Sequence, residues 1–129
     1  MLSLPSIPES VSVAVDAAEA IVRDGGVSED VISRVTLAVA EAIANAIEHG
    51  SDATGTGEVL LDVQADSDAV RVRVRDGGEG VSASRLQSAS LPEDLLQTHG
   101  RGLYLIRVLS DEVDVTDGWL HLVFSERST

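Results

Sequence analysis

The chain has 129 residues, of which 43% are hydrophobic, so it can bury the core of a single domain spanning residues 1–129. Its formal net charge of −13 at pH 7 opposes direct binding to nucleic acid, and its one Trp, one Tyr and one Phe provide no stacking platform for bases. Cysteine is absent, which excludes a disulfide framework and thiolate chemistry.

The N-terminal part of the chain predicts a short strand followed by a helix. Residues 2–4 predict the strand, and the helix is expected from about Glu9 to Asp24, where Gly25-Gly26 ends it. This N-terminus lacks a charged segment followed by an apolar one, and no run in the chain approaches a membrane span. We therefore expect a soluble cytoplasmic protein with no membrane contact.

A second helix is predicted to begin after Ser28 and to end near His49-Gly50. Ser28 is a suitable N-cap, and the acidic Glu29 and Asp30 lie in the first turn, where the helix dipole favours negative charge. Apolar residues recur at three- and four-residue spacing and form a core stripe: Val31, Val35, Ala38, Val39, Ala42, Ala46 and Ile47. This helix is therefore expected to lie against the core.

The middle of the chain predicts two strands and a loop. Apolar and polar residues alternate from Val59 to Ala65 and again from Val70 to Val74, which predicts strands with one apolar face. Arginines occupy the polar positions of the second strand, and we expect them to be solvated and paired across strands with Asp62 or Asp114, rather than to form a surface for an acidic partner. Residues 82–99 show weak periodicity and predict a lid-like loop.

The C-terminal part completes an α/β chain. Residues 102–110 predict an apolar helix, and Asp117-Gly118 predicts a hairpin that joins residues 113–116 to residues 119–124. The expected fold class is α/β, as an α+β two-layer sandwich. Its sheet would be mixed, mainly antiparallel, with the helices packed on its one apolar face.

The second helix carries a polar pair beside its apolar stripe. Glu41 and Asn45 are four residues apart, so their side chains lie on the same face of the helix. The amide oxygen of Asn45 can bind Mg²⁺ without adding negative charge near a triphosphate. Glu41, one turn earlier, can accept a proton from an attacking hydroxyl or water. A solvated polar stripe is the alternative interpretation of this pair.

A carboxylate and three glycines follow the second predicted strand. Asp76 has the same parity as Val72 and Val74, so its side chain is expected to point toward the interior. An inward carboxylate needs a donor, and the exocyclic amine of adenine is one. Gly78 and Gly80 allow the backbone to approach a flat base closely. Asp-Gly is also a turn signal, which leaves a simple hairpin as the alternative.

A third motif, Gly100-Arg101-Gly102, precedes the apolar helix. The free amides at a helix start can hold phosphate oxygens, and Arg101 adds positive charge there. A glycine-rich entry into a buried helix is the alternative when this motif is considered alone. The three motifs in this order together predict a pocket for ATP and Mg²⁺.

These residues resemble a known superfamily. The run from Glu41 to Gly50 resembles the N box, Asp76-x-Gly78-x-Gly80 resembles the G1 box, and Gly100-x-Gly102 resembles the G2 box of the GHKL ATP-binding proteins. The small size and short lid are most similar to bacterial anti-sigma-factor serine kinases. Some relatives place an Arg just before the G2 box, where this chain has Thr98-His99.

The resemblance implies a GHKL (Bergerat) ATP-binding fold and assigns roles by position. Glu41 would be the catalytic base, and Asn45 would bind Mg²⁺. Asp76 would bind the adenine amine in a pocket that Gly78 and Gly80 shape. The phosphates would lie against the lid hinge, which is formed by Gly100, Arg101 and Gly102.

The resemblance also implies an activity and partners. Family members are ATP-dependent protein serine kinases that phosphorylate a small STAS-domain anti-anti-sigma protein. They bind a sigma factor in the alternative complex, often as homodimers. Two other functions stay open from the sequence: a non-catalytic binding module gated by nucleotide, and a detached ATPase domain of a larger signalling system. The chain shows neither the dimerisation helix nor the phosphoacceptor His motif of such a signalling system, which argues against the second of these functions.

Overall fold

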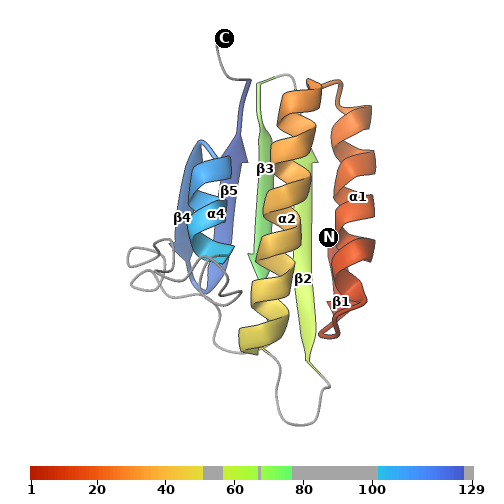
Figure 1. The fold of residues 1–129 in the computed structure, drawn as a ribbon, viewed down its shortest axis with the longest axis vertical. Helices are drawn as coiled ribbons and strands as arrows, with labels where there is room; N and C mark the ends of the chain where they lie inside the picture. Colours follow the sequence, from red (N-terminus) through yellow and green to blue (C-terminus); the bar gives the residue numbers. More distant parts are fainter. Residues whose placement is uncertain (51–56, 67, 77–101, 127–129) are drawn as a thin grey trace, which may run out of the picture.

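The computed structural model describes residues 1–50, 57–66, 68–76 and 102–126. In these ranges one sheet and three helices form two layers, and all three helices cover the same face of the sheet (Figure 1). In chain order the elements are β1 (Leu2–Pro5), α1 (Ser10–Asp24), α2 (Glu29–Gly50), β2 (Glu58–Ala65), β3 (Val70–Arg75), α4 (Gly102–Leu109), β4 (Glu112–Thr116) and β5 (Trp119–Phe124).

The sheet has the strand order β1-β2-β3-β5-β4, and every neighbouring pair is antiparallel. β3 lies in the centre, where Val72 is opposite Val63 of β2 and opposite Leu122 of β5. The predicted hairpin is present: Asp117 (φ 54°) and Gly118 (φ 80°) both adopt positive φ, as a type I′ turn requires. The mainly antiparallel two-layer fold expected from the sequence is thereby confirmed.

The core lies between α2 and the apolar face of the sheet. Alternate residues of the central strands point toward the helices and are almost fully buried: Val59, Leu61, Val70, Val72, Val74, Leu120, Leu122 and Phe124. α2 contributes the largest helical share, and its buried apolar residues are Val31, Ile32, Val35, Ala38, Val39, Ala42, Ile43 and Ala46. Because α2 packs against both α1 and α4, it is the central helix of its layer (Figure 1).

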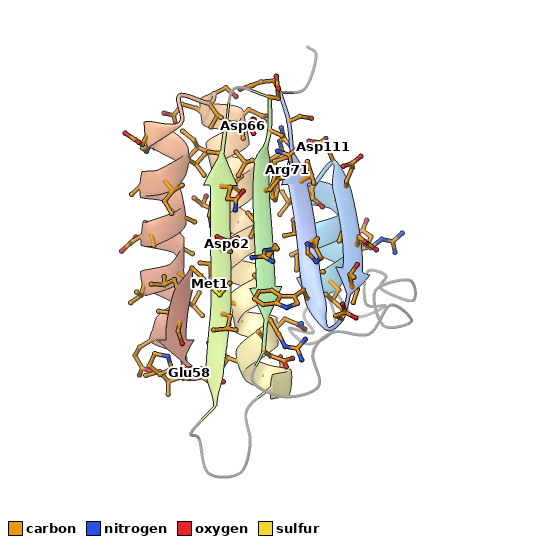
Figure 2. All side chains as sticks on the ribbon, turned by 180° about the vertical axis from the view of Figure 1, so that it is seen from behind. Met1, Glu58, Asp62, Asp66, Arg71 and Asp111 are labelled. Carbon is orange, nitrogen blue, oxygen red and sulfur yellow. The ribbon has the colours of Figure 1, made fainter. Side chains whose placement is uncertain are left out.

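The opposite face of the sheet has no helix over it among the described residues, and it carries the arginines of β3. Figure 2 shows this face, with Asp62 and Arg71 on it. Arg73 pairs with Asp62 across the strands at 3.0 Å, as expected. Arg71 instead pairs with Asp66 at 3.3 Å. Asp114 lies on β4, which β5 separates from β3, and its carboxylate accepts a hydrogen bond from the Thr116 hydroxyl (3.1 Å) rather than from these arginines.

The predicted element boundaries agree with the structure to within about two residues, as helix and strand ends usually allow. The first helix begins at Ser10 and is followed by Gly25, and the second ends at Gly50. The lid-like loop predicted at residues 82–99 lies outside the described residues.

Candidate functional site

Three elements that carry or adjoin predicted site residues each have one end at the same side of the molecule. The C-terminal end of α2, the C-terminal end of β3 and the N-terminal end of α4 all lie at the lower end in Figure 1. The antiparallel course of α4 relative to α2 explains this, because Leu109 at the end of α4 lies beside Arg34 near the start of α2. The fold thus gathers residues that are up to about 60 positions apart in the chain.

Glu41 and Asn45 lie on α2 at the border between core and solvent. Both side chains are partly exposed, whereas their neighbours Ala42, Ile43 and Ala46 are buried. One helical turn separates them, so a carboxylate and an amide oxygen face the same region. The amide oxygen of Asn45 suits Mg²⁺, which prefers oxygen ligands. The residues present are therefore compatible with the predicted metal.

Asp76 directly follows β3 and is only 7% exposed. It keeps the parity of Val72 and Val74, which are 1% and 3% exposed, so the burial predicted from strand alternation is confirmed. A carboxylate in such a place is stable only when donors surround it. Asp76 thus provides a strong hydrogen-bond acceptor at the end of the core.

Gly102 is the first residue of α4, as predicted. Leu103 and Ile106 anchor this helix in the core, with 7% and 0% exposure, so its first turn is fixed against α2. Free N–H groups at such a helix start can receive an anion. The other predicted site residues, Gly78, Gly80, Gly100 and Arg101, lie outside the described residues.

The start of α2 lies at the opposite end of the molecule and is held by side chains. The Ser28 hydroxyl accepts a hydrogen bond from the Val31 backbone N–H at 3.3 Å, which confirms Ser28 as the N-cap. Ser28 also donates from its hydroxyl (2.6 Å) and its backbone N–H (3.0 Å) to the carboxylate of Glu126. These bonds from Ser28 hold the pKa of Glu126 below its ordinary value.

A buried arginine on α2 was not among the residues singled out from the sequence. Arg34 is 5% exposed and donates hydrogen bonds to Asp30 (3.0 Å), to Asp111 (3.1 Å), and to the backbone carbonyls of Leu109 (3.3 Å) and Ser125 (2.6 Å). A signal was present, because this charged residue interrupts the apolar stripe. It also precedes Glu41 by seven residues, which is two helical turns.

One sequence-family model matches nearly the whole chain. The family model described as "Histidine kinase-like ATPase domain" matches residues 4–125. That range includes every described helix and all of the described strands except Leu2 and Ser3 of β1. The chain therefore belongs to the family of histidine kinase-like ATPase domains.

Three curated relatives of this chain are all serine-protein kinases. A serine-protein kinase RsbW of Listeria monocytogenes is 30% identical over 118 residues, which are 87% of this chain and 75% of the relative. The protein of the same name from Bacillus licheniformis is 33% identical over 86% of this chain and 73% of its own length. That from Oceanobacillus iheyensis is 27% identical over 90% and 77%. The resemblance to anti-sigma-factor serine kinases of the GHKL superfamily is thereby confirmed.

Two further features are absent from the described part of the chain. No helix there is long and apolar enough to cross a membrane. No group of three or more His, Cys, Asp or Glu side chains is arranged there to hold a metal ion.

Proposed function

We propose that this protein is an ATP-dependent protein serine kinase that phosphorylates a STAS-domain anti-anti-sigma protein. The observation that carries the proposal is the buried carboxylate of Asp76 directly after β3. The C-terminal end of β3 lies at the same end of the molecule as the C-terminal end of α2, the helix that carries Glu41 and Asn45 (Figure 1). Membership of the histidine kinase-like ATPase family and similarity to three serine-protein kinases named RsbW support ATP as the donor and serine as the acceptor.

Each residue has a separate task in this proposal. Asp76 accepts a hydrogen bond from the adenine amine and so selects the base. Asn45 holds Mg²⁺ through its amide oxygen, and the start of α4 at Gly102, with Gly100 and Arg101 before it, receives the phosphates. Gly78 and Gly80 let the backbone approach the base.

Glu41 accepts the proton of the serine hydroxyl as that oxygen attacks the γ-phosphorus. The bond between the γ-phosphorus and the β-phosphate oxygen breaks as the serine–phosphorus bond forms, and ADP leaves. When bound at Asn45, Mg²⁺ would neutralise the negative charge of the phosphates. The chain's own contribution is then mainly positioning: α2 holds the base and the metal ligand one turn apart, and β3 and α4 place the two ends of the nucleotide.

The partners follow from the same proposal. The protein would act in the cytoplasm as a single domain of residues 1–129, and as a homodimer would bind a sigma factor when its anti-anti-sigma substrate is phosphorylated. The net charge of −13 favours protein partners over nucleic acid or membrane.

The test is transfer of labelled γ-phosphate from Mg-ATP to each STAS-domain protein of the source organism. We expect one protein to be labelled on serine. Glu41→Gln should reduce transfer by at least about a hundredfold while nucleotide binding is kept, because only the base is lost. Asn45→Ala should reduce both transfer and Mg²⁺-dependent binding.

Glu29→Gln is the matched control, because it makes the same change on the same helix at the end far from the site. It should leave transfer unchanged. If no STAS-domain protein is labelled while Mg-ATP still binds, the kinase proposal is wrong and a non-catalytic module gated by nucleotide replaces it.

A further inference from the structure

The buried guanidinium of Arg34 joins three separate parts of the fold. Its bonds reach Asp30 on its own helix, the carbonyl of Leu109 at the end of α4, and the carbonyl of Ser125 just after β5. Asp111 closes the group, because its Oδ2 accepts from Arg34 (3.1 Å) and from the backbone N–H of Ser125 (2.7 Å). The Arg34 side chain is only 6% exposed, while its partners Asp111 and Asp30 are 27% and 63% exposed, so the guanidinium is shielded from solvent on its own side of these charge-assisted bonds.

Arg34 lies on the same stripe of α2 as the two predicted catalytic-site residues. Ala38, Glu41 and Asn45 follow it by four, seven and eleven residues, so all four side chains fall within about 60° around the helix. This stripe faces α4, because Arg34 contacts the Leu109 carbonyl. The seam between α2 and α4 therefore has Arg34 at one end and Glu41 with Asn45 toward the other.

α4 is a short rigid link between these two ends. It has eight residues, so it is about 12 Å long. At its C-terminal end the positive Arg34 binds the Leu109 carbonyl, which complements the helix dipole, and the Ser110 hydroxyl donates to Ile106 O at 2.6 Å. At its other end, Gly102 begins the helix beside the C-terminal half of α2 (Figure 1). A tilt of α4 at Leu109 thus moves the helix start relative to Asn45.

We propose that Arg34 is a positioning residue for nucleotide phosphates: by fixing α4 against α2, it sets the distance between the first turn of α4 and the Glu41/Asn45 pair. This inference rests on the proposed function, which places phosphates at Gly102 and Mg²⁺ at Asn45. In this proposal Arg34 acts through α4 and does not itself bind the nucleotide. Its hydrogen bonds reach α2, the ends of α4 and β5, and Asp111, and none of them within the described residues goes to β3, which Asp76 follows.

Because the Arg34 hydrogen bonds do not reach β3, substitution of Arg34 should affect phosphate binding more than adenine binding, and this can be tested directly. In the full chain, Arg34→Met keeps the length of the apolar stem and removes the guanidinium. We expect the affinity for Mg-ADP to fall about tenfold, because its phosphates need the start of α4 in register with Asn45. The affinity for adenosine should change less than about twofold, because the base is held from Asp76. Titration calorimetry measures both.

Arg23→Met is the matched control. Arg23 also forms an ion pair with the first turn of α2, through Glu29 at 2.7 Å, but it comes from α1 and is exposed. This variant should bind Mg-ADP and adenosine as the wild type does. If Arg34→Met lowers both affinities equally, or neither, Arg34 is a structural residue only and the inference is wrong.

Asp111→Asn is the second variant and tests the same seam if Arg34→Met does not fold. It removes the charge that orients Arg34 and Ser125 without removing the buried guanidinium. It should weaken Mg-ADP selectively, by about threefold, and an equal loss for adenosine contradicts the inference. A wild-type chain that binds neither ligand instead contradicts the proposed function itself, so the two failures are distinguishable.

Discussion

Glu126 shows how a single residue from the end of the chain stabilises the start of α2. Its carboxylate accepts two hydrogen bonds from Ser28, which lies 98 positions earlier, and it stands where the helix dipole favours negative charge. The bonds from Ser28 keep the pKa of Glu126 below its ordinary value in the folded protein. The unfolded chain therefore binds this proton more readily than the folded chain does.

A pH dependence follows from that difference. The stabilisation from Glu126 is complete above the ordinary carboxyl range and is lost as the pH falls through the lowered pKa. We expect Glu126→Gln to lower the urea midpoint modestly at about pH 7, and this difference to shrink progressively as the pH falls below the ordinary carboxyl range. The pH-dependent difference should shrink in a Ser28→Ala background. A difference that persists undiminished in acid contradicts this assignment.

At the residue scale, local patterns were predictable and distant partners were not. Ser28 was identified as the N-cap because its neighbours Glu29 and Asp30 complete a familiar helix start. The inward direction of Asp76 followed from strand parity. By contrast, the bonds of Ser28 to Glu126 and of Arg34 to Ser125 join residues 98 and 91 positions apart. No local spacing encodes such contacts.

Among the elements, the β4–β5 hairpin is specified by two residues. Asp117 and Gly118 both adopt positive φ, and Arg75 of β3 donates a hydrogen bond to the Asp117 carbonyl, which attaches the turn to the sheet. Asp tolerates this conformation at the first position, and Gly has no Cβ to oppose it at the second. The register of β4 against β5, which places Thr116 opposite Trp119, depends on this turn.

Substitutions at Gly118 and Asp117 should show how far the stability of the hairpin depends on positive φ at each position. Gly118→Ala forces a Cβ into positive φ and should lower the free energy of unfolding by about 1 kcal/mol. Asp117→Asn serves as the control and should be nearly neutral, because Asn also tolerates the left-handed region. Denaturant titration of the three proteins measures this. An Ala variant as stable as the wild type indicates that the backbone relaxes to another turn.

At the element scale, hydrophobic periodicity was sufficient where each element buries one face. α2 and the strands β2 and β3 were predicted because apolar residues recur at the helical or strand period. The layer arrangement then followed, since only one face of the sheet is apolar. The pairing of Arg71 with Asp66 was missed, because the side chain reaches the residue just after β2 instead of the strand opposite.

The whole molecule carries a formal net charge of −13, so its acidic groups repel one another. We expect the midpoint of thermal unfolding to rise by a few degrees as NaCl increases from about 0.05 M to about 0.5 M, because salt screens this repulsion. A variant with Asp16→Asn and Asp24→Asn, both exposed on α1, should show a smaller rise. A midpoint that falls with salt would mean that local ion pairs outweigh the repulsion.

At this scale the position of the candidate site was predicted in part. Glu41, Asn45, Asp76 and Gly102 were identified from motifs, and the fold brings the ends of their elements to one side of the molecule. The seam that holds α4 against α2 was not predicted, because it depends on where helix α4 packs. Packing between elements distant in sequence is a property of the assembled core rather than of any motif.

The register of the central strands places Phe124 and Asp76 at opposite ends of the molecule. Phe124 at the end of β5 lies opposite Val70, the first residue of β3, while Asp76 follows the last. A fluorophore or a sensor surface attached through the exposed Glu126 position would therefore stand at the pole remote from Asp76. The protein could be immobilised in a single orientation with the Asp76 end, where we propose that the nucleotide binds, facing the solution.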